Sequence, residues 1–337
     1  MVAVAQLVRA PACGAGGRGF EPLQPPHISE TRNRSSSFWK LPRLFYMKQQ
    51  LRAILELTRY REYLKFVLII SLLGVATANG IFGWRLIGVV VANWLIVAFA
   101  FMINDVEDAK DDAQNPTKAK RNPISAGRLS VSTGYTITFL VVFITVILLY
   151  FLGLRPLIVG VICLVISFLY SWRAIRLKSI PVIDLLSHGL MLAGLLLLVS
   201  FFAFEASISY RWIWPFLSVT LISFYGQLHN ELRDLETDLK VGIKNTAVFL
   251  GKVKTQWLMM TFLFLGVVSG IVSLIILELI PLWVLILAAG LTLILIIKPL
   301  LQLRSNQSLA EKQESLRKPF EIATAIALTL QFLIPWG

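Results

Sequence analysis

Residues 84–112 read WRLIGVVVANWLIVAFAFMI followed by NDVEDAKDD, an apolar run that ends in a cluster of acidic residues. A helix needs about 20 apolar residues to cross the hydrocarbon core of a bilayer, and this run has that length. The arrangement recurs at residues 210–238, where a second apolar run ends in NELRDLETD. The repeated pattern predicts a helical membrane protein that carries polar chemistry at one membrane face.

The composition extends this prediction to most of the chain, which is 56% hydrophobic and 15% charged. An ordinary soluble domain carries more charge, and too little polar sequence remains here to cover the apolar runs in water. We therefore expect an all-α integral membrane protein in which nine transmembrane helices form a bundle, with the two acidic motifs at its cytoplasmic side. The expected spans are residues 63–82, 84–103, 131–153, 155–172, 181–204, 210–229, 256–277, 281–301 and 319–337.

The basic residues set the expected orientation. Residues 48–65 and the loops after the second, fourth, sixth and eighth runs hold most of the Lys and Arg residues of this region. The opposite ends of the runs carry Arg85, Arg155 and Arg211. Since cytoplasmic loops are enriched in Lys and Arg, we expect the N-terminus and both motifs to face the cytoplasm, in the cytoplasmic membrane of a prokaryote. The net charge of +13 then reflects topology, and nucleic acid is not an expected partner.

Residues 1–46 have a different character, because they are rich in Pro, Gly, Ser and Arg and lack apolar periodicity. The stretch VAQLVRAPACGAGGRGFEP at residues 4–22 resembles a spurious translation of a transfer-RNA gene. We expect residues 1–46 to be a non-native or disordered extension and residues 47–337 to form the polytopic domain. The alternative is a genuine disordered cytoplasmic tail.

The two acidic motifs align residue by residue. On a helix, the three acidic positions of each copy lie within about 60° of one another, because their offsets are 3 and 7 residues. Two such faces could hold divalent cations between them, and the cations could hold a diphosphate, which the carboxylates alone would repel. The aligned pairs are Asn104 and Asn230, Asp105 and Glu231, Asp108 and Asp234, and Asp112 and Asp238.

These motifs also carry a family resemblance. Asn104-Asp105-x-x-Asp108-x-x-x-Asp112 resembles the first aspartate-rich motif of the UbiA-type intramembrane prenyltransferases, and Asp234-x-x-x-Asp238 resembles the second. The segments NPTKAKRNPISAGRLS (residues 115–130) and GIKNTAVFLG (residues 242–251) resemble the segments that follow them. Tyr170 to Lys178, with Asp184, resembles the middle loop of the family. The resemblance covers residues from about 50 to 337, and nine helices are also the family's fold.

The resemblance implies an enzyme that transfers a prenyl group from a prenyl diphosphate to a hydrophobic or aromatic acceptor within the membrane, with Mg²⁺ as cofactor. Residues 47–337 would be the prenyltransferase domain, and the pathway would be quinone, carotenoid or other lipid biosynthesis. The implied catalytic residues are Asp105, Asp108, Asp112, Asp234 and Asp238. The implied metal ligands are these five with Asn230 and Glu231. The implied diphosphate-binding residues are Asn104, Lys118, Arg121, Tyr170, Arg176, Lys178 and Lys244.

Two regions depart from the family pattern. Arg61-Glu62-Tyr63 stands where many members have an Arg-Pro sequence, and either Arg173 or Lys178 could take the place of the lysine in the middle loop. Outside the motif positions, we expect Glu107, Asp111 and Glu236 to be solvated loop residues. Asp184 is expected to be a helix cap, and His188 and His229 are expected to be packed or hydrogen-bonded side chains.

Other functions remain open at this stage. A secondary transporter could also carry repeated polar motifs, although these motifs lie at helix ends and not within broken helices. Within the family, a polyprenyl-phosphate phosphoribosyltransferase is the alternative enzyme branch. A non-catalytic scaffold would give no reason for two aligned acidic faces.

Overall fold

The computed structural model describes residues 40–205, 209–302 and 309–334, so most of the expected 1–46 extension lies outside the described residues. The chain divides into two units, Met1–Phe45 and Tyr46–Gly337, and the second contains the apolar helices. The described residues form helices and no strands. These are α1 (Lys40–Thr58), α2 (Tyr60–Thr77), α3 (Trp84–Glu107), α4 (Ala109–Asp112), α5 (Pro116–Arg121), α6 (Val131–Leu152), α7 (Leu154–Ser171), η1 (Leu177–Ser179), α8 (Ile183–Gly189), η2 (Leu190–Gly194), α9 (Leu195–Phe202), α10 (Ile213–Val241), α11 (Thr246–Leu250), α12 (Lys252–Leu277), α13 (Leu282–Gln302) and α14 (Leu309–Leu333).

Six of the described helical segments are long and apolar enough to cross a membrane: α3, α6, α7, the continuous segment of α8, η2 and α9, α12 and α13. The other three expected spans coincide with α2, α10 and α14. These three helices carry charged residues near one end, such as Arg61 and Glu62 in α2. The described part of every expected span is therefore largely helical, whereas six segments meet the criterion of length and apolarity.

The centre of the bundle is formed by α3 and the segment of α8, η2 and α9, whose apolar windows are each 67% buried. Asn93 of α3 holds this centre together, because its Nδ2 donates to Ser71 Oγ of α2 at 2.9 Å and to Ser200 Oγ of α9 at 2.9 Å. Such hydrogen bonds join helices where apolar contact alone gives little preference over lipid. Gly74 of α2 permits the close approach, since a Cβ there would lie 2.5 Å from the Leu197 carbonyl oxygen.

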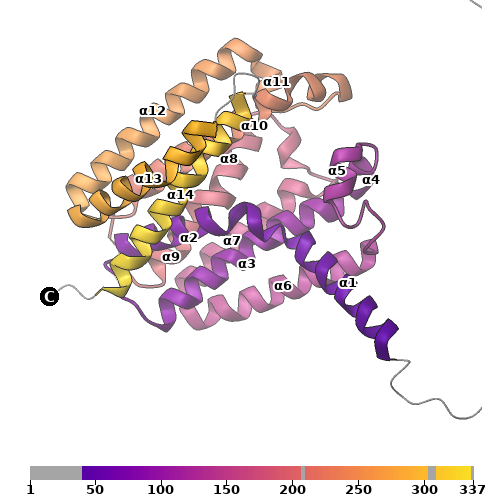
Figure 1. Cartoon of the computed structure of the whole chain (residues 1–337), viewed down its shortest axis with the longest axis horizontal. Coiled ribbons are helices and arrows are strands. Elements are labelled where there is room, and N and C mark those ends of the chain that lie inside the picture. The colour runs from indigo at the N-terminus through magenta and orange to yellow at the C-terminus, as the bar shows by residue number, and fades with distance from the viewer. Residues whose placement is uncertain (1–39, 206–208, 303–308, 335–337) are drawn as a thin grey trace, which may run out of the picture. The chain divides into compact units, whose positions relative to one another are not determined.

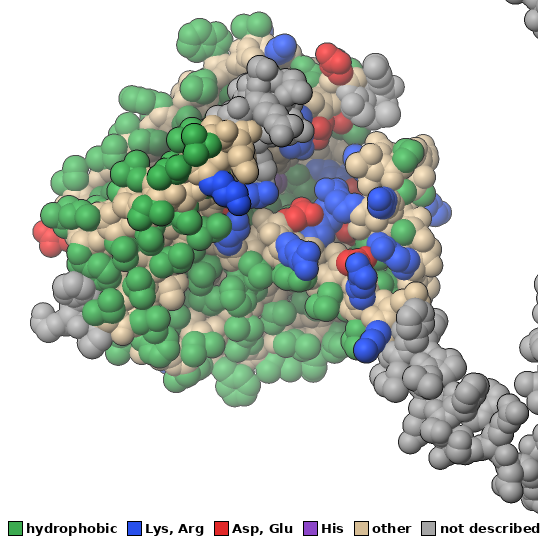
Figure 2. All heavy atoms as spheres, viewed as in Figure 1, with side chains coloured by type: hydrophobic (Ala, Val, Ile, Leu, Met, Phe, Trp, Pro, Cys, Tyr) green, Lys and Arg blue, Asp and Glu red, His purple; other side chains and the backbone are tan. Residues whose placement is uncertain are grey.

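The remaining helices surround this centre. Figure 1 shows α10, α12, α13 and α14 together on one side, with α3, α6 and α7 on the other, in agreement with the contacts that pair α10 with α12, α13 with α14 and α3 with α6. Figure 2 shows a broad apolar surface below a face where charged side chains gather. Phe143 of α6 and Phe264 of α12 are exposed on such apolar helices. An apolar surface of this extent indicates contact with lipid.

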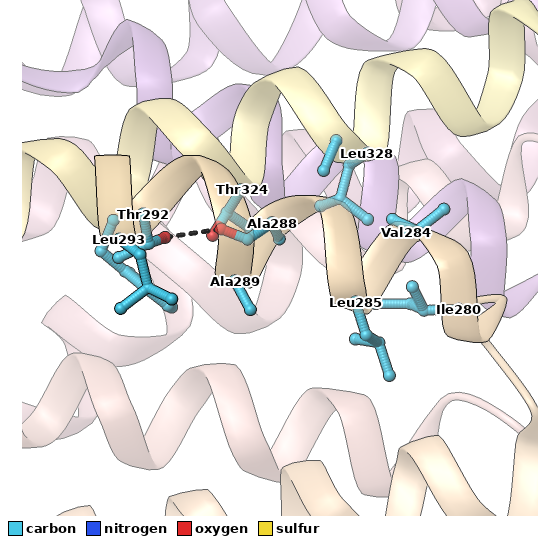
Figure 3. Close-up of a pocket in the computed structure, with 11 residues that line it drawn as sticks. Ile280, Val284, Leu285, Ala288, Ala289, Thr292, Leu293, Thr324 and Leu328 are labelled. Atoms are coloured by element: carbon cyan, nitrogen blue, oxygen red, sulfur yellow. Dashed lines mark hydrogen bonds between the residues drawn. The ribbon is translucent and has the colours of Figure 1, made fainter. Parts of the chain in front are cut away.

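A cavity of about 470 Å³ lies between α13 and α14. Figure 3 shows Val284, Ala288 and Leu328 along it, and Thr292 at one end donates its hydroxyl to the Ala288 carbonyl oxygen at 2.7 Å. None of the residues that line this cavity belongs to the acidic motifs. It is therefore separate from the charged face.

Candidate active site

The first acidic motif begins on the last turn of α3. Asp105 is fully buried, and both of its carboxylate oxygens accept from one guanidinium: Arg59 Nε lies 2.9 Å from Oδ2, and Arg59 Nη2 donates to Oδ1. Arg59 adopts the left-handed backbone conformation, with φ of 50°, between α1 and α2. In the sequence, Arg59 is one of several basic residues before α2, and no local pattern marks it as a site residue. The structure thus places Asp105 in a buried ion pair that links α2 to α3.

Asp108, where α3 meets α4, lies among basic side chains. Lys178 Nζ contacts Asp108 Oδ2 and lies 2.8 Å from Asn104 Oδ1, and Arg176 Nη2 lies 3.2 Å from Asp108 Oδ1. Arg176 has φ of 49° at the start of η1, and this turn brings both basic residues back to the motif. Burial lowers the pKa of the Lys178 ammonium, while the neighbouring Asp108 carboxylate raises it in part. The middle loop is therefore anchored to the first motif through Lys178.

Asp112 ends α4 and is held by Asn122, a fully buried residue of the loop that follows α5. Asn122 Nδ2 donates to Asp112 Oδ2 at 3.0 Å and to the Asp105 carbonyl oxygen at 2.8 Å. Its own Oδ1 accepts from the backbone N–H of Ile124 at 3.0 Å. Asn122 is a site residue that sequence reasoning missed, although it lies within the segment that resembles the family.

Glu107 was expected to be a solvated loop residue, and this expectation is wrong. Its side chain is buried, and its Oε1 accepts from the Tyr135 hydroxyl of α6 at 2.7 Å. The backbone N–H of Arg173 donates to Oε2 at 3.2 Å, and Arg173 Nε donates to the Glu107 carbonyl oxygen at 2.8 Å. Asp111 is exposed as expected, and it pairs with Arg173 and Arg176. Arg173 therefore holds the first motif through its contacts with Glu107 and Asp111.

The second motif lies on the last turns of α10. Asp238 accepts from Asn245 Nδ2 at 2.8 Å, and Asn245 Oδ1 in turn accepts from the Val248 N–H at the start of α11. Burial raises the pKa of Asp238, and the nearby Lys118 ammonium opposes that rise. Asp234 is exposed beside Arg233. Asn230, the first residue of the motif, and Lys244, in the loop after α10, are also exposed.

Glu231 of this motif and Asp184 of α8 are both buried. Glu231 accepts from Gln227 Nε2 at 2.9 Å and from the Ala247 N–H at 3.0 Å. Asp184 is fully buried, and both its oxygens accept from Thr246: its backbone N–H donates to Oδ2 at 2.6 Å and its hydroxyl to Oδ1. Asp184 lies inside the first turn of α8, whose cap is Val182, so the expectation of a helix cap is wrong. The two carboxyl groups tie α11 to α10 and α8.

Tyr170 interacts with residues of both motifs. It is the last but one residue of α7, and its side chain lies within electrostatic range of Asp108 in the first motif, of Glu231 in the second and of Asp184 in α8, and interacts with Gln227. Lys118 follows the first motif and lies close enough to Asp238 to lower the pKa of that carboxyl group. Arg121 lies close enough to Asp105 to attract its carboxylate. Figure 2 shows acidic and basic side chains gathered around a hollow on this face. The face therefore combines residues of both motifs.

The donor set of this face is suited to a hard cation, because its candidate ligands are carboxylate and amide oxygens. Within residues 40–205, 209–302 and 309–334, no three His, Cys, Asp or Glu side chains converge in a metal-binding arrangement. The first-motif carboxylates instead meet Arg59, Lys178 and Asn122. The chemistry of the donors fits Mg²⁺.

Comparison with curated proteins gives two relatives. The chain is 28% identical over 183 residues to a lycopene elongase/hydratase of Haloarcula japonica, covering 49% of this chain and 56% of that protein. It is 28% identical over 152 residues to a decaprenyl-phosphate phosphoribosyltransferase of Corynebacterium glutamicum, covering 42% of this chain and 44% of that protein. The chain thus spans about half the length of the curated relatives it matches.

Comparison with solved structures gives the fold. A UbiA homolog from Archaeoglobus fulgidus, bound to GPP and Mg²⁺, superposes with a TM-score of 0.63 at 21% identity, covering 83% of this chain and 98% of that one. A UbiA homolog from Aeropyrum pernix K1 superposes with a TM-score of 0.61 at 18% identity, covering 80% and 96%. The model of the UbiA prenyltransferase family matches residues 67–317. The chain belongs to the UbiA prenyltransferase family.

Proposed function

We propose that this protein is a membrane enzyme that transfers a prenyl group from a prenyl diphosphate to a hydrophobic or aromatic acceptor. Family membership supports prenyl transfer. The observation that carries the proposal is that Tyr170 interacts electrostatically with residues of both acidic motifs, and that Lys118, Arg176 and Lys178 lie beside motif carboxylates. Such a face can receive a diphosphate while the apolar chain of the substrate stays among helices.

We infer that Mg²⁺ is the cofactor. The motif residues that we propose would hold it are Asn104, Asp108, Asp112, Asn230, Glu231, Asp234 and Asp238. When bound, Mg²⁺ neutralises the charge that builds up on a leaving diphosphate. The Arg59 guanidinium already neutralises Asp105, so we propose that Asp105 has a structural role and holds the end of α3 in place.

The basic residues of the same face are the proposed diphosphate contacts. Arg176 and Lys178 reach it from η1, and Lys118 and Arg121 reach it from α5. Arginine offers two parallel N–H groups to phosphate oxygens, whereas lysine offers a compact positive charge. Tyr170 would add a hydroxyl from α7, and Lys244 lies in the loop after α10. These groups stabilise the charge that develops on the diphosphate as the allylic C–O bond breaks.

The arrangement in the membrane belongs to the same proposal. We infer nine spans, because α2, α10 and α14 complete the six most apolar segments. The distribution of Lys and Arg supports a cytoplasmic charged face. The prenyl chain and the acceptor would then meet inside the bilayer, where the surrounding side chains exclude water from an allylic cation. We retain residues 47–337 as the enzymatic domain.

The direct test is transfer of a labelled prenyl group. Membranes from cells that express the chain are incubated with radiolabelled dimethylallyl diphosphate and Mg²⁺, and the label in the lipid fraction is compared with that from membranes lacking the chain. We expect label in a new lipid species together with released diphosphate. Equal labelling of both membranes, with no added diphosphate release, would contradict the proposal.

A phosphoribosyl transfer is the second candidate, favoured by the match to the Corynebacterium glutamicum enzyme. The same assay distinguishes it, because labelled phosphoribosyl diphosphate would then label a polyprenyl phosphate while dimethylallyl diphosphate would label no lipid. Movement of a solute without consumption of either diphosphate would instead support the transporter alternative.

A further inference from the structure

A stripe of polar side chains runs down α10 from the second motif into its apolar half. Thr220, Ser223, Gln227 and Glu231 follow one another at spacings of 3, 4 and 4 residues, which places them on one face of the helix. At about 1.5 Å per residue, the stripe extends about 16 Å along the helix axis. Polar residues at membrane depth are costly and mark functional sites. The diphosphate site uses the upper end of this stripe and leaves the lower part unexplained.

His188 of α8 contacts this polar stripe at Ser223. Its Nδ1 lies 3.3 Å from Ser223 Oγ, and its other ring nitrogen, Nε2, makes no hydrogen bond with the described residues. His188 follows Asp184 by four residues and so lies on the same face of α8, one turn further into the membrane. Its ring centroid is 6.4 Å from that of Tyr170. The imidazole thus lies near the Tyr170 ring, about one helical turn further into the membrane than Asp184.

The backbone next to His188 is also unusual. The chain continues from α8 into the π-helical turn Leu190–Gly194, a feature that is frequent at functional sites. This turn packs against α10, and a Cβ at Gly194 would lie 2.6 Å from Thr220 Oγ1. Thr220 Oγ1 is buried and has no hydrogen-bond partner among the described residues. A buried hydroxyl without a partner is rare in folded proteins, and this one lies where the π-helical turn packs on α10.

We propose that His188 accepts the proton that a carbon acceptor releases after prenyl transfer, and that the acceptor therefore binds beside the His188 ring. This rests on the proposed prenyl transfer and requires an acceptor with a carbon–carbon double bond or an aromatic ring. The depth of His188 suits this role. The allylic carbon is joined to the diphosphate by a single oxygen. The acceptor carbon must therefore lie just on the membrane side of the motifs, where His188 also lies.

The electrons and atoms of the step balance without a further reactant. The allylic C–O bond breaks and its electron pair leaves with the diphosphate. A π electron pair of the acceptor forms the new C–C bond, which leaves a cation on the acceptor. A C–H bond next to that cation then breaks, its electron pair restores the double bond or aromatic ring, and the proton passes to His188 Nε2. An Nδ1–H donated to Ser223 Oγ leaves the Nε2 lone pair free for this proton.

The test separates cleavage of the diphosphate from formation of the prenylated product. The full chain is assayed in membranes of cells that contain lycopene, with dimethylallyl diphosphate and Mg²⁺, and released diphosphate and prenylated lipid are measured together. His188→Gln keeps a hydrogen-bonding side chain and lacks the base, and His188→Phe keeps the ring. We expect both to release diphosphate at no less than half the wild-type rate, and to form about 100-fold less prenylated lipid, with prenyl alcohol in its place.

Two further variants give this result a control. Ser223→Ala removes the partner of Nδ1 and should lower the ratio of prenylated lipid to released diphosphate, while Thr145→Val removes a buried hydroxyl that bonds only within α6 and should leave that ratio unchanged. The proposal is overturned if the His188 variants keep the wild-type ratio, or if they lose both products together. It is also overturned if the wild type releases diphosphate without a carbon-coupled product. A wild-type chain that releases no diphosphate would contradict the proposed function instead.

Discussion

Arg59 and Asp105 form a bidentate ion pair 46 residues apart in the chain, and their side chains are 7% and 0% exposed. A buried carboxylate without its partner is strongly destabilising, so the pair fixes the position where the first acidic motif leaves α3. The remaining motif residues, Asp108 and Asp112, point to other partners. We therefore expect Asp105 to hold the motif in place and Asp108 and Asp112 to face the ligand.

The first prediction concerns this pair. Arg59→Met leaves Asp105 buried and uncompensated, and should lower the free energy of unfolding by about 3–5 kcal/mol. Arg59→Lys keeps the charge but loses one of two hydrogen bonds, so its loss should be smaller. Thermal unfolding in detergent checks both, with the exposed Arg52→Met as control. Equal melting temperatures for Arg59→Met and Arg52→Met would contradict the assigned role.

The second prediction concerns two asparagines with equivalent contacts. Asn122 donates to the last carboxylate of the first motif, Asp112, and Asn245 donates to the last carboxylate of the second, Asp238. Each also accepts from a backbone N–H of the segment that follows. Replacement of either by Ala should weaken Mg²⁺ binding, raising the half-saturating Mg²⁺ concentration for turnover about 10-fold to 100-fold. A Mg²⁺ titration that is unchanged in both variants would show that these contacts are structural.

The third prediction separates the basic residues of the middle loop. Lys178 contacts Asn104 and Asp108, whereas Arg173 braces Glu107 and the exposed Asp111. Lys178→Ala should raise KM for the prenyl diphosphate at least about 10-fold, since one charge-assisted contact is lost. Arg173→Ala should lower the melting temperature more than it changes KM. Steady-state kinetics together with thermal unfolding decide between the two, and the reverse pattern would contradict the assignment.

The fourth prediction is metal dependence. Carboxylates of two motifs that meet at one diphosphate repel it unless cations lie between them. A chelator should therefore abolish diphosphate release, and Mg²⁺ added in excess should restore it. Full release in chelator, with no residual metal by elemental analysis, would be inconsistent with the proposed cofactor.

The helices were predictable from sequence because hydropathy is a local property: the runs at residues 84–103 and 131–153 coincide with α3 and α6. The site was predictable only in part. Arg59 stands in a basic segment beside Arg61, and nothing local indicates that it reaches Asp105. Glu107 was misassigned for the same reason, since its partners Tyr135 and Arg173 lie 28 and 66 residues away. Contacts between distant segments depend on how helices pack, which spacing along one helix does not determine.

The π-helical turn at Leu190–Gly194 could not be predicted from the sequence either. Its residues are apolar, so the sequence indicates a continuous span, and no local pattern marks the turn that packs against α10. Asp184 illustrates the intermediate case. Its position before an apolar run indicated a cap, but Thr246 satisfies the carboxylate from another helix.

We propose that the two acidic motifs serve one site, and a comparison of single substitutions tests this proposal. Asp108→Ala and Asp234→Ala are assayed for prenyl transfer beside Glu236→Ala, which removes an exposed carboxylate from the same turns of α10. We predict that each aspartate variant loses about 100-fold or more of its turnover at normal membrane insertion, and that Glu236→Ala keeps wild-type turnover. Near wild-type turnover in either Asp108→Ala or Asp234→Ala would contradict the account, because one motif would then act without the other.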